Sequence, residues 1–149
     1  MKQLIYILVL LSSGMMTGAY AVTQDEMEKI VTDTADIIES KKGLVVFEYK
    51  KVKMALVSDV DHDRMRIISP ITKYSELTLE QVNIIMEANF HRALDARYAT
   101  SKDVLYSAFI HPLSSLSEAE LTDALNQVAT LALTFGSTYS SSELSFAGE

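Results

Sequence analysis

The chain has 149 residues, with 20 Asp and Glu against 13 Lys and Arg, which gives a formal net charge of −7. This acidic balance argues against nucleic-acid binding, whose affinity comes mainly from neutralising phosphates. The absence of cysteine excludes disulfides, thiol catalysis, a lipidated cysteine and cysteine-ligated metals.

The first 21 residues have the pattern of a cleaved export signal. Lys2 supplies a positive charge, Leu4 to Leu11 is an apolar run, and Ala19-Tyr20-Ala21 fits the small-x-small cleavage site. The apolar run is shorter than the about 20 residues that a membrane-spanning helix needs. We therefore expect cleavage after Ala21, no membrane span in the mature chain, and a periplasmic or secreted location.

One domain is predicted over residues 22–136, followed by a serine-rich tail over 137–149. Thr23 and Glu26 form a capping box, and apolar residues then recur at helical spacing as far as Ile38. Gly43 fits the residue that follows a helix C-terminus. These features predict a first helix over about 24–41.

Three strands are predicted next, over 44–49, 52–58 and 64–71, because these segments are rich in β-branched and aromatic residues. The aspartates of 59–63 favour a turn, since their side chains bond to nearby backbone amides. Pro70 is expected to end the third strand. The short connections require an antiparallel arrangement.

A second helix is predicted from the capping box of Thr78 and Gln81. Six apolar residues share its expected core face: Leu79, Val82, Met86, Phe90, Ala93 and Leu94. Ile84, Ile85 and Ala88 lie towards the opposite face, and a helix on a sheet needs only one apolar stripe. This second patch therefore requires another cover, which is another part of the same chain (for example its C-terminal tail), a second copy of the protein or a client.

Asn89 lies beside the expected core face of the same helix. A buried amide must be paired, because an unpaired one costs about 1–3 kcal/mol. We expect its side chain to bond to the backbone of the turn that follows the helix.

Two more strands are predicted over 96–100 and 104–111, joined by a short hairpin loop. Ser117 and Glu120 then form a third capping box, whose helix is expected to reach Gly136. The order helix, three strands, helix, two strands, helix predicts a single α+β domain. In it the helices pack on a five-stranded antiparallel sheet.

This order, together with the segment Met86-Glu87-Ala88-Asn89-Phe90, resembles the type III secretion chaperone-like fold, which includes the Tir-chaperone type and the YbjN-type proteins. In that family the helix ends in an acidic-Ala-Asn-Phe signature, and the later apolar strand leads to a Pro-Leu element like Pro112-Leu113. The resemblance extends over most of the mature chain. It implies a small, acidic, non-catalytic protein that is often a homodimer and holds segments of other proteins. Secretion chaperones work in the cytoplasm, whereas this chain carries an export signal, so a different client is expected.

Motifs for metals and catalysis are incomplete. The alternating aspartates of 59–63 resemble a calcium loop, but an EF-hand would need Gly and Glu where Arg64 and Pro70 stand. The histidines have no zinc-binding spacing, and no Gly-x-Ser-x-Gly motif accompanies His111 and the serines that follow it. We expect a solvated turn, a hydrogen-bonding histidine, and no metal or cofactor.

Lys51 and Arg66 belong to a group of cationic residues, with Lys50, Lys53 and Arg64, on an otherwise acidic chain. They are either a contact for an anionic partner or residues that discourage aggregation of strand edges. The leading hypothesis is an exported, non-enzymatic, chaperone-like module. It would bind an envelope partner or protein client of unknown identity through the 84–88 patch, Lys51 and Arg66. The alternatives are an envelope adaptor or sensor domain that binds a small ligand or a folded partner and, well behind it, a small hydrolase.

Overall fold

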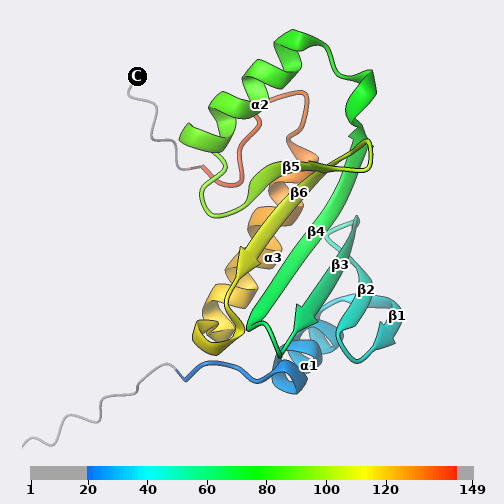
Figure 1. Cartoon of the computed structure of the whole chain (residues 1–149), viewed down its shortest axis with the longest axis vertical. Helices are drawn as coiled ribbons and strands as arrows, with labels where there is room; N and C mark the ends of the chain where they lie inside the picture. The colour runs from blue at the N-terminus through cyan, green and yellow to red at the C-terminus, as the bar shows by residue number, and fades with distance from the viewer. Residues whose placement is uncertain (1–19, 144–149) are drawn as a thin grey trace, which may run out of the picture.

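The computed structural model describes residues 20–143, so positions 1–19 of the predicted signal and 144–149 of the tail lie outside it (Figure 1). The helices are α1 (Gln24–Thr34), α2 (Leu79–His91) and α3 (Glu118–Leu133), and the 3-10 turns are η1 (Tyr74–Glu76) and η2 (Leu113–Ser115). The strands are β1 (Asp36–Lys41), β2 (Leu44–Tyr49), β3 (Val52–Asp59), β4 (Arg64–Lys73), β5 (Arg97–Ser101) and β6 (Val104–His111).

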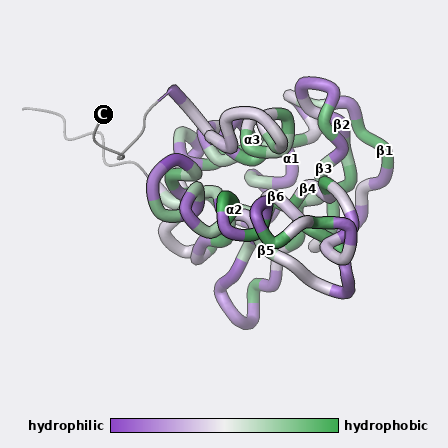
Figure 2. Tube along the Cα trace, turned by 90° about the horizontal axis from the view of Figure 1, so that it is seen from above, coloured by the Kyte–Doolittle hydropathy of each residue, from purple (hydrophilic) through white to green (hydrophobic). Residues whose placement is uncertain are grey.

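The strands form one antiparallel sheet in the order β1-β2-β3-β4-β6-β5. Figures 1 and 2 show α1 and α3 on the same side of this sheet, whereas α2 lies beside the edge strand β5. Arg66 and Ile110 lie on the opposite side of the sheet and are exposed. The α+β class, the single domain and the helices packed on an antiparallel sheet are confirmed.

The core fills the space between the sheet and the two helices on its covered face. Its buried members alternate along the strands and recur at helical spacing on α1 and α3. The largest fully buried side chains are Phe47, Met27, Met54, Leu56, Met65, Ile67, Leu105, Leu116, Leu121, Leu125, Leu131 and Val31. The Ser107 hydroxyl donates to the carbonyl oxygen of Val128 at 3.0 Å, which joins β6 to α3 within this core.

All three predicted capping boxes are present. Thr23, Thr78 and Ser117 each accept a hydrogen bond from the backbone N–H three residues later. The glutamate or glutamine at that position accepts the N–H of the capping residue in return. These pairs satisfy N–H groups that no intrahelical carbonyl reaches.

The predicted first helix is too long, and the predicted five-stranded sheet has six strands. α1 ends at Thr34, and Ala35 adopts an extended conformation (φ −133°, ψ 161°). Residues 36–41 then form β1, which pairs with β2 as a hairpin closed next to Gly43 (φ +83°). The helical spacing that reached Ile38 was misleading, because pairing with β2 satisfies the backbone of this segment equally well.

The third predicted strand is too short. β4 continues through Pro70 to Lys73, with a register shift between Pro70 and Thr72. The pairing of β4 with β3 ends at Ile68. Backbone groups point to alternate sides along a strand, so the Pro70 nitrogen points to the β3 side, where β4 has no pairing partner at this position. Proline is tolerated in a strand where its nitrogen has no ladder partner.

The orientation of α2 is the reverse of the predicted one. Ile85 and Ala88 are buried, whereas Leu79, Met86 and Phe90 point to solvent. The Asn89 side chain fixes this orientation, because it donates to the Tyr98 carbonyl oxygen at 3.0 Å and accepts the Tyr98 N–H at 2.7 Å. The expected structural role of Asn89 is confirmed, with strand β5 as its partner instead of a turn.

The segment after α3 returns to the end of α2. Tyr139 is buried and its ring meets those of Tyr98 and Phe135 edge-on, with centroids 6.2 and 5.5 Å away. The Ser141 N–H donates to the Arg92 carbonyl oxygen at 3.2 Å. The first part of the predicted tail therefore packs on the domain. Over the described residues, no helix combines the length and the apolar content needed to cross a membrane.

Candidate protein-binding surfaces

The predicted 84–88 patch is covered by the chain itself. Only 5% of the surface of Ile85 and 2% of that of Ala88 are exposed, and Ile84 is partly buried against the same core. Of the three possible coverings of these residues, the structure therefore shows the one within the chain, in which they pack against the domain's own core. Ile85 and Ala88 therefore offer a partner almost no apolar surface, and Ile84 offers only part of its side chain.

The apolar surface of α2 lies on its other side. Leu79, Met86 and Phe90 are 78%, 64% and 81% exposed, and their spacing of seven and four residues places them on one helix face. We call these three residues, with the half-buried Val82 between them, the α2 outer surface. Three large apolar side chains gathered on one exposed helix face are typical of an interaction site.

The cationic residues do not form one cluster. Lys51 lies in the turn between β2 and β3, whereas Arg66 lies in β4 opposite Val57. Val57 lies five positions along β3 from Val52, which is about 17 Å at the usual rise. Lys50 has its own partner, because its Nζ donates to the Asn126 side-chain oxygen at 2.6 Å. Lys51 and Arg66 thus belong to different surfaces.

Arg66 lines a shallow apolar hollow of about 240 Å³ on the open face of the sheet. Ile68, Ala108 and Ile110 form much of its apolar lining, and Ala99 and Tyr106 contribute from β5 and β6. We call it the sheet hollow. The aliphatic stem of an arginine can serve as an apolar wall while its head stays in water.

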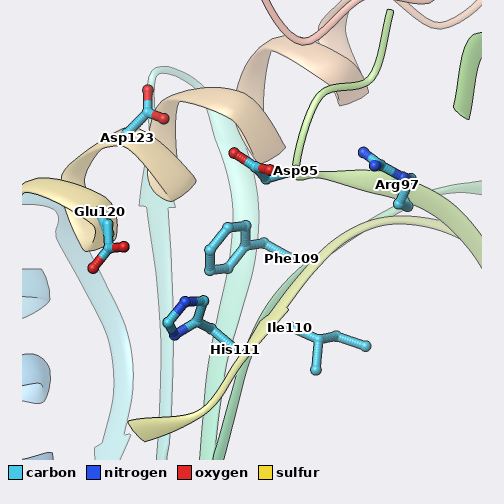
Figure 3. Close-up of a pocket in the computed structure, with 7 residues that line it drawn as sticks. All are labelled: Asp95, Arg97, Phe109, Ile110, His111, Glu120 and Asp123. Carbon is cyan, nitrogen blue, oxygen red and sulfur yellow. The ribbon is translucent and has the colours of Figure 1, made fainter. Parts of the chain in front are cut away.

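A second depression, of about 330 Å³, lies where β5 begins and β6 extends beyond its pairing with β5 (Figure 3). We call it the edge pocket, and its lining residues are Asp95, Arg97, Phe109, Ile110, His111, Glu120 and Asp123. The rings of Phe109 and His111 stack with centroids 5.8 Å apart and planes 8° from parallel. The His111 Nδ1 lies 2.8 Å from the Pro112 carbonyl oxygen and donates to it, because a carbonyl oxygen can only accept.

Gln127 of α3 holds the acidic rim of the edge pocket in place. Its buried side-chain oxygen accepts the N–H groups of Asp95 and Ala96 at 3.0 Å each. Its amide nitrogen donates to Asp123 at 2.7 Å. Glu120 accepts from both the N–H and the hydroxyl of Ser117 at 2.7 Å. These contacts fix where the carboxylates stand, and nothing local in the sequence signals that residues 95–97 and 120–127 meet.

The predicted turn at 59–63 is present, and two of its carboxylates are already bonded. Asp59 accepts the His62 N–H at 3.1 Å and lies 2.8 Å from the His62 Nδ1. Asp63 accepts the N–H and the hydroxyl of Ser114 at 2.7 Å each, which ties the turn to η2. Within residues 20–143 no three His, Asp or Glu side chains converge as metal ligands.

The hydrogen-bonded carboxylates of Glu120 and Asp63 should make the stability of the domain depend on pH in the acidic range. Hydrogen bonds from Ser117 hold the pKa of Glu120 below its usual 4.5, and those from Ser114 hold the pKa of Asp63 below its usual 3.8. A pKa that is lower in the folded state stabilises the fold above the unfolded-state value, and this stability is lost as pH falls through the folded-state value. We expect the melting temperature, followed by circular dichroism, to fall below about pH 4.5.

Glu120→Gln is the control for this acid dependence. Glutamine also completes a capping box but does not titrate, so the fall in melting temperature between about pH 5 and pH 3 should be shallower than in the wild type. Identical pH profiles would mean that Glu120 does not contribute.

The described residues thus present exposed apolar side chains both on the open face of the sheet and on the neighbouring helix α2. Neither protein-family models nor curated protein sequences give a match to this chain. Solved structures do match, and three of them are complexes of two proteins.

One match is in the HopA1–SchA chaperone–effector complex, with 9% identity, a TM-score of 0.56, and coverage of 75% of this chain and 88% of that chain. Another is in the Yersinia pestis type III secretion chaperone SycH bound to a YscM2 fragment, with 15% identity, a TM-score of 0.56, and coverage of 75% and 98%. A third is in the ExsC–ExsE complex, with 9% identity, a TM-score of 0.55, and coverage of 84% and 98%. The chain therefore has the type III secretion chaperone-like fold, as the sequence resemblance predicted, and at these identities the likeness concerns the fold.

Proposed function

We propose that this protein is a non-enzymatic, chaperone-like binding module that uses the α2 outer surface to hold another protein or a second copy of itself. The observation that carries this proposal is the exposure of Leu79, Met86 and Phe90 on one helix face. The three structural matches support it, because each comes from a complex of two proteins.

The proposed place of action is the periplasm or the secreted space. Its support is the N-terminal sequence, in which a charged residue, an apolar run and Ala19-Tyr20-Ala21 follow one another. The client is then an envelope or secreted protein. A homodimer is the simplest assembly in which two α2 outer surfaces cover each other, because a two-fold axis pairs a patch with itself.

The proposal is tested with Met86→Glu, which places a charge in the middle of the α2 outer surface. The wild type and the variant are compared by light scattering and by affinity capture from an envelope extract. We expect the variant to lose the dimer, or the captured proteins, at unchanged melting temperature. Ile38→Glu is the matched control, since Ile38 is an exposed apolar residue on β1, away from α2. A monomeric wild type whose captured proteins do not change in Met86→Glu would refute the proposal.

A further inference from the structure

The last residues of β6 have a neighbouring strand on one side only. β5 pairs with β6 from Ser101 opposite Val104 to Arg97 opposite Ala108, and there the ladder ends. β4 continues on the other side, with Ile67 opposite Phe109 and Met65 opposite His111. Residues 109–111 of β6 are thus a sheet edge, and the edge pocket lies along it (Figure 3).

The register fixes which backbone groups this edge presents. The N–H and C=O of Tyr98 face away from β6, since both bond to Asn89. In an antiparallel ladder the backbone groups of successive residues point to alternate sides, so the N–H and C=O of Arg97 point towards Ala108 on β6. On β6 the backbone groups of Ala108 point towards β5, and those of Ile110, two residues later, point to the same side. The Ile110 N–H and C=O therefore point to the place that β5 does not reach. A donor and an acceptor presented in this way are a template for an added strand.

Side chains of an added strand would meet different surroundings on its two faces, because successive residues point to opposite sides. On the helix side lies the edge pocket, with Asp95, Glu120 and Asp123 on its rim. On the open side lies the sheet hollow, whose lining is mainly apolar. Ile110 lines both depressions, so one short strand would reach both.

We propose that the free edge of β6 binds a short extended segment of a partner protein in which basic and apolar residues alternate. A lysine or arginine enters the edge pocket, where three carboxylates outnumber the single cation of Arg97. The apolar residues next to it lie on the sheet hollow. Backbone pairing with Ile110 supplies affinity, and the two depressions select the side chains. This inference rests on the proposed protein-binding role and adds the kind of segment that is bound, on a surface separate from α2.

The test uses a blocked six-residue peptide of alternating lysine and valine, titrated into the domain while backbone amide shifts are followed by NMR. We expect the Ile110 amide to shift and the binding to weaken with added salt. The double variant Asp95→Asn with Asp123→Asn should bind about tenfold more weakly, because hydrogen bonds to charged groups are the strong ones. Asp25→Asn with Asp33→Asn is the matched control: it removes the same charge from α1 and should bind as the wild type does.

Two further peptides separate strand addition from attraction between opposite charges. Two peptides are made, one methylated on the backbone nitrogens of the odd-numbered residues and the other on those of the even-numbered residues. Both keep the charge of the parent peptide, but one of the two has lost the N–H groups that would pair with β6. We expect this peptide to lose binding. Equal affinity of the two methylated peptides and the unmethylated peptide would overturn the proposal. A glutamate–valine peptide should not bind, and binding of it as tight as that of the lysine peptide would overturn the charge assignment.

A variant of the α2 outer surface separates peptide binding at β6 from the protein binding proposed for α2. Phe90→Asp changes α2 only, so its affinity for the lysine–valine peptide should equal that of the wild type. Loss of peptide binding in this variant would overturn the assignment to β6. The proposed function would then still stand on the Met86→Glu result.

Discussion

Replacing Ile85 by aspartate is expected to unfold the domain or to lower its free energy of unfolding by about 3–5 kcal/mol. Ile85 is 5% exposed and belongs to the same buried cluster as Ala88, Tyr98 and Leu131. A carboxylate at this position would be taken out of water without a compensating cation, and an uncompensated buried charge is among the most damaging single changes. Urea unfolding followed by circular dichroism measures the loss.

Phe90→Asp is the matched variant on the other side of the same helix. Phe90 is 81% exposed, so its replacement should change the free energy of unfolding by no more than about 0.5 kcal/mol. The two variants carry the same new side chain five residues apart and should differ by several kilocalories per mole. The opposite result, with Phe90→Asp unfolded and Ile85→Asp stable, would restore the helix orientation that the periodicity of the sequence predicts.

That periodicity failed for α2 because the helix has apolar residues on two faces. Leu79, Met86 and Phe90 make the longer stripe, and a longer stripe usually marks the core. The core face is decided instead by contacts with distant residues: Asn89 bonds to Tyr98, and the small side chain of Ala88 next to it is buried. A sequence cannot rank two apolar stripes when the partners of each lie elsewhere in the chain.

The junction of α1 and β1 failed for a related reason. Ile37 and Ile38 fit the end of a helical stripe, and Lys41, Lys42 and Gly43 fit its C-terminus. The same residues also fit a hairpin, in which Gly43 supplies the positive φ and the strand pairs with β2. The local signal was compatible with both structures, and the presence of β2 as a pairing partner decided between them.

Features that depend on a few neighbouring residues were predicted correctly. Each capping box needs only two residues three positions apart, and all three were found. β2 and β6 were also placed correctly, because each has a run of β-branched and aromatic residues between clear turns. The edge pocket had no such signal, since Asp95, His111 and Asp123 come from three separate segments that only the packing of α3 brings together.

Asn89→Leu is expected to lower the free energy of unfolding by about 1–3 kcal/mol. The Asn89 amide pairs with both backbone groups of Tyr98, which is 5% exposed, so a leucine would leave a donor and an acceptor without partners where water has little access. Asn83→Leu is the control, because Asn83 lies on the same helix and is exposed. Its change should stay within about 0.5 kcal/mol in the same urea titration.

Asn89→Leu should also change how β5 behaves as a sheet edge. In the wild type the amide of Asn89 occupies the outward backbone groups of Tyr98, as a neighbouring strand would, and so protects this edge from pairing with another chain. Without it, the edge becomes available, and we expect concentration-dependent association in Asn89→Leu beyond that of the wild type. Light scattering at several concentrations measures this, and a variant that is destabilised but stays as monodisperse as the wild type would show that Asn89 supports the core without guarding the edge.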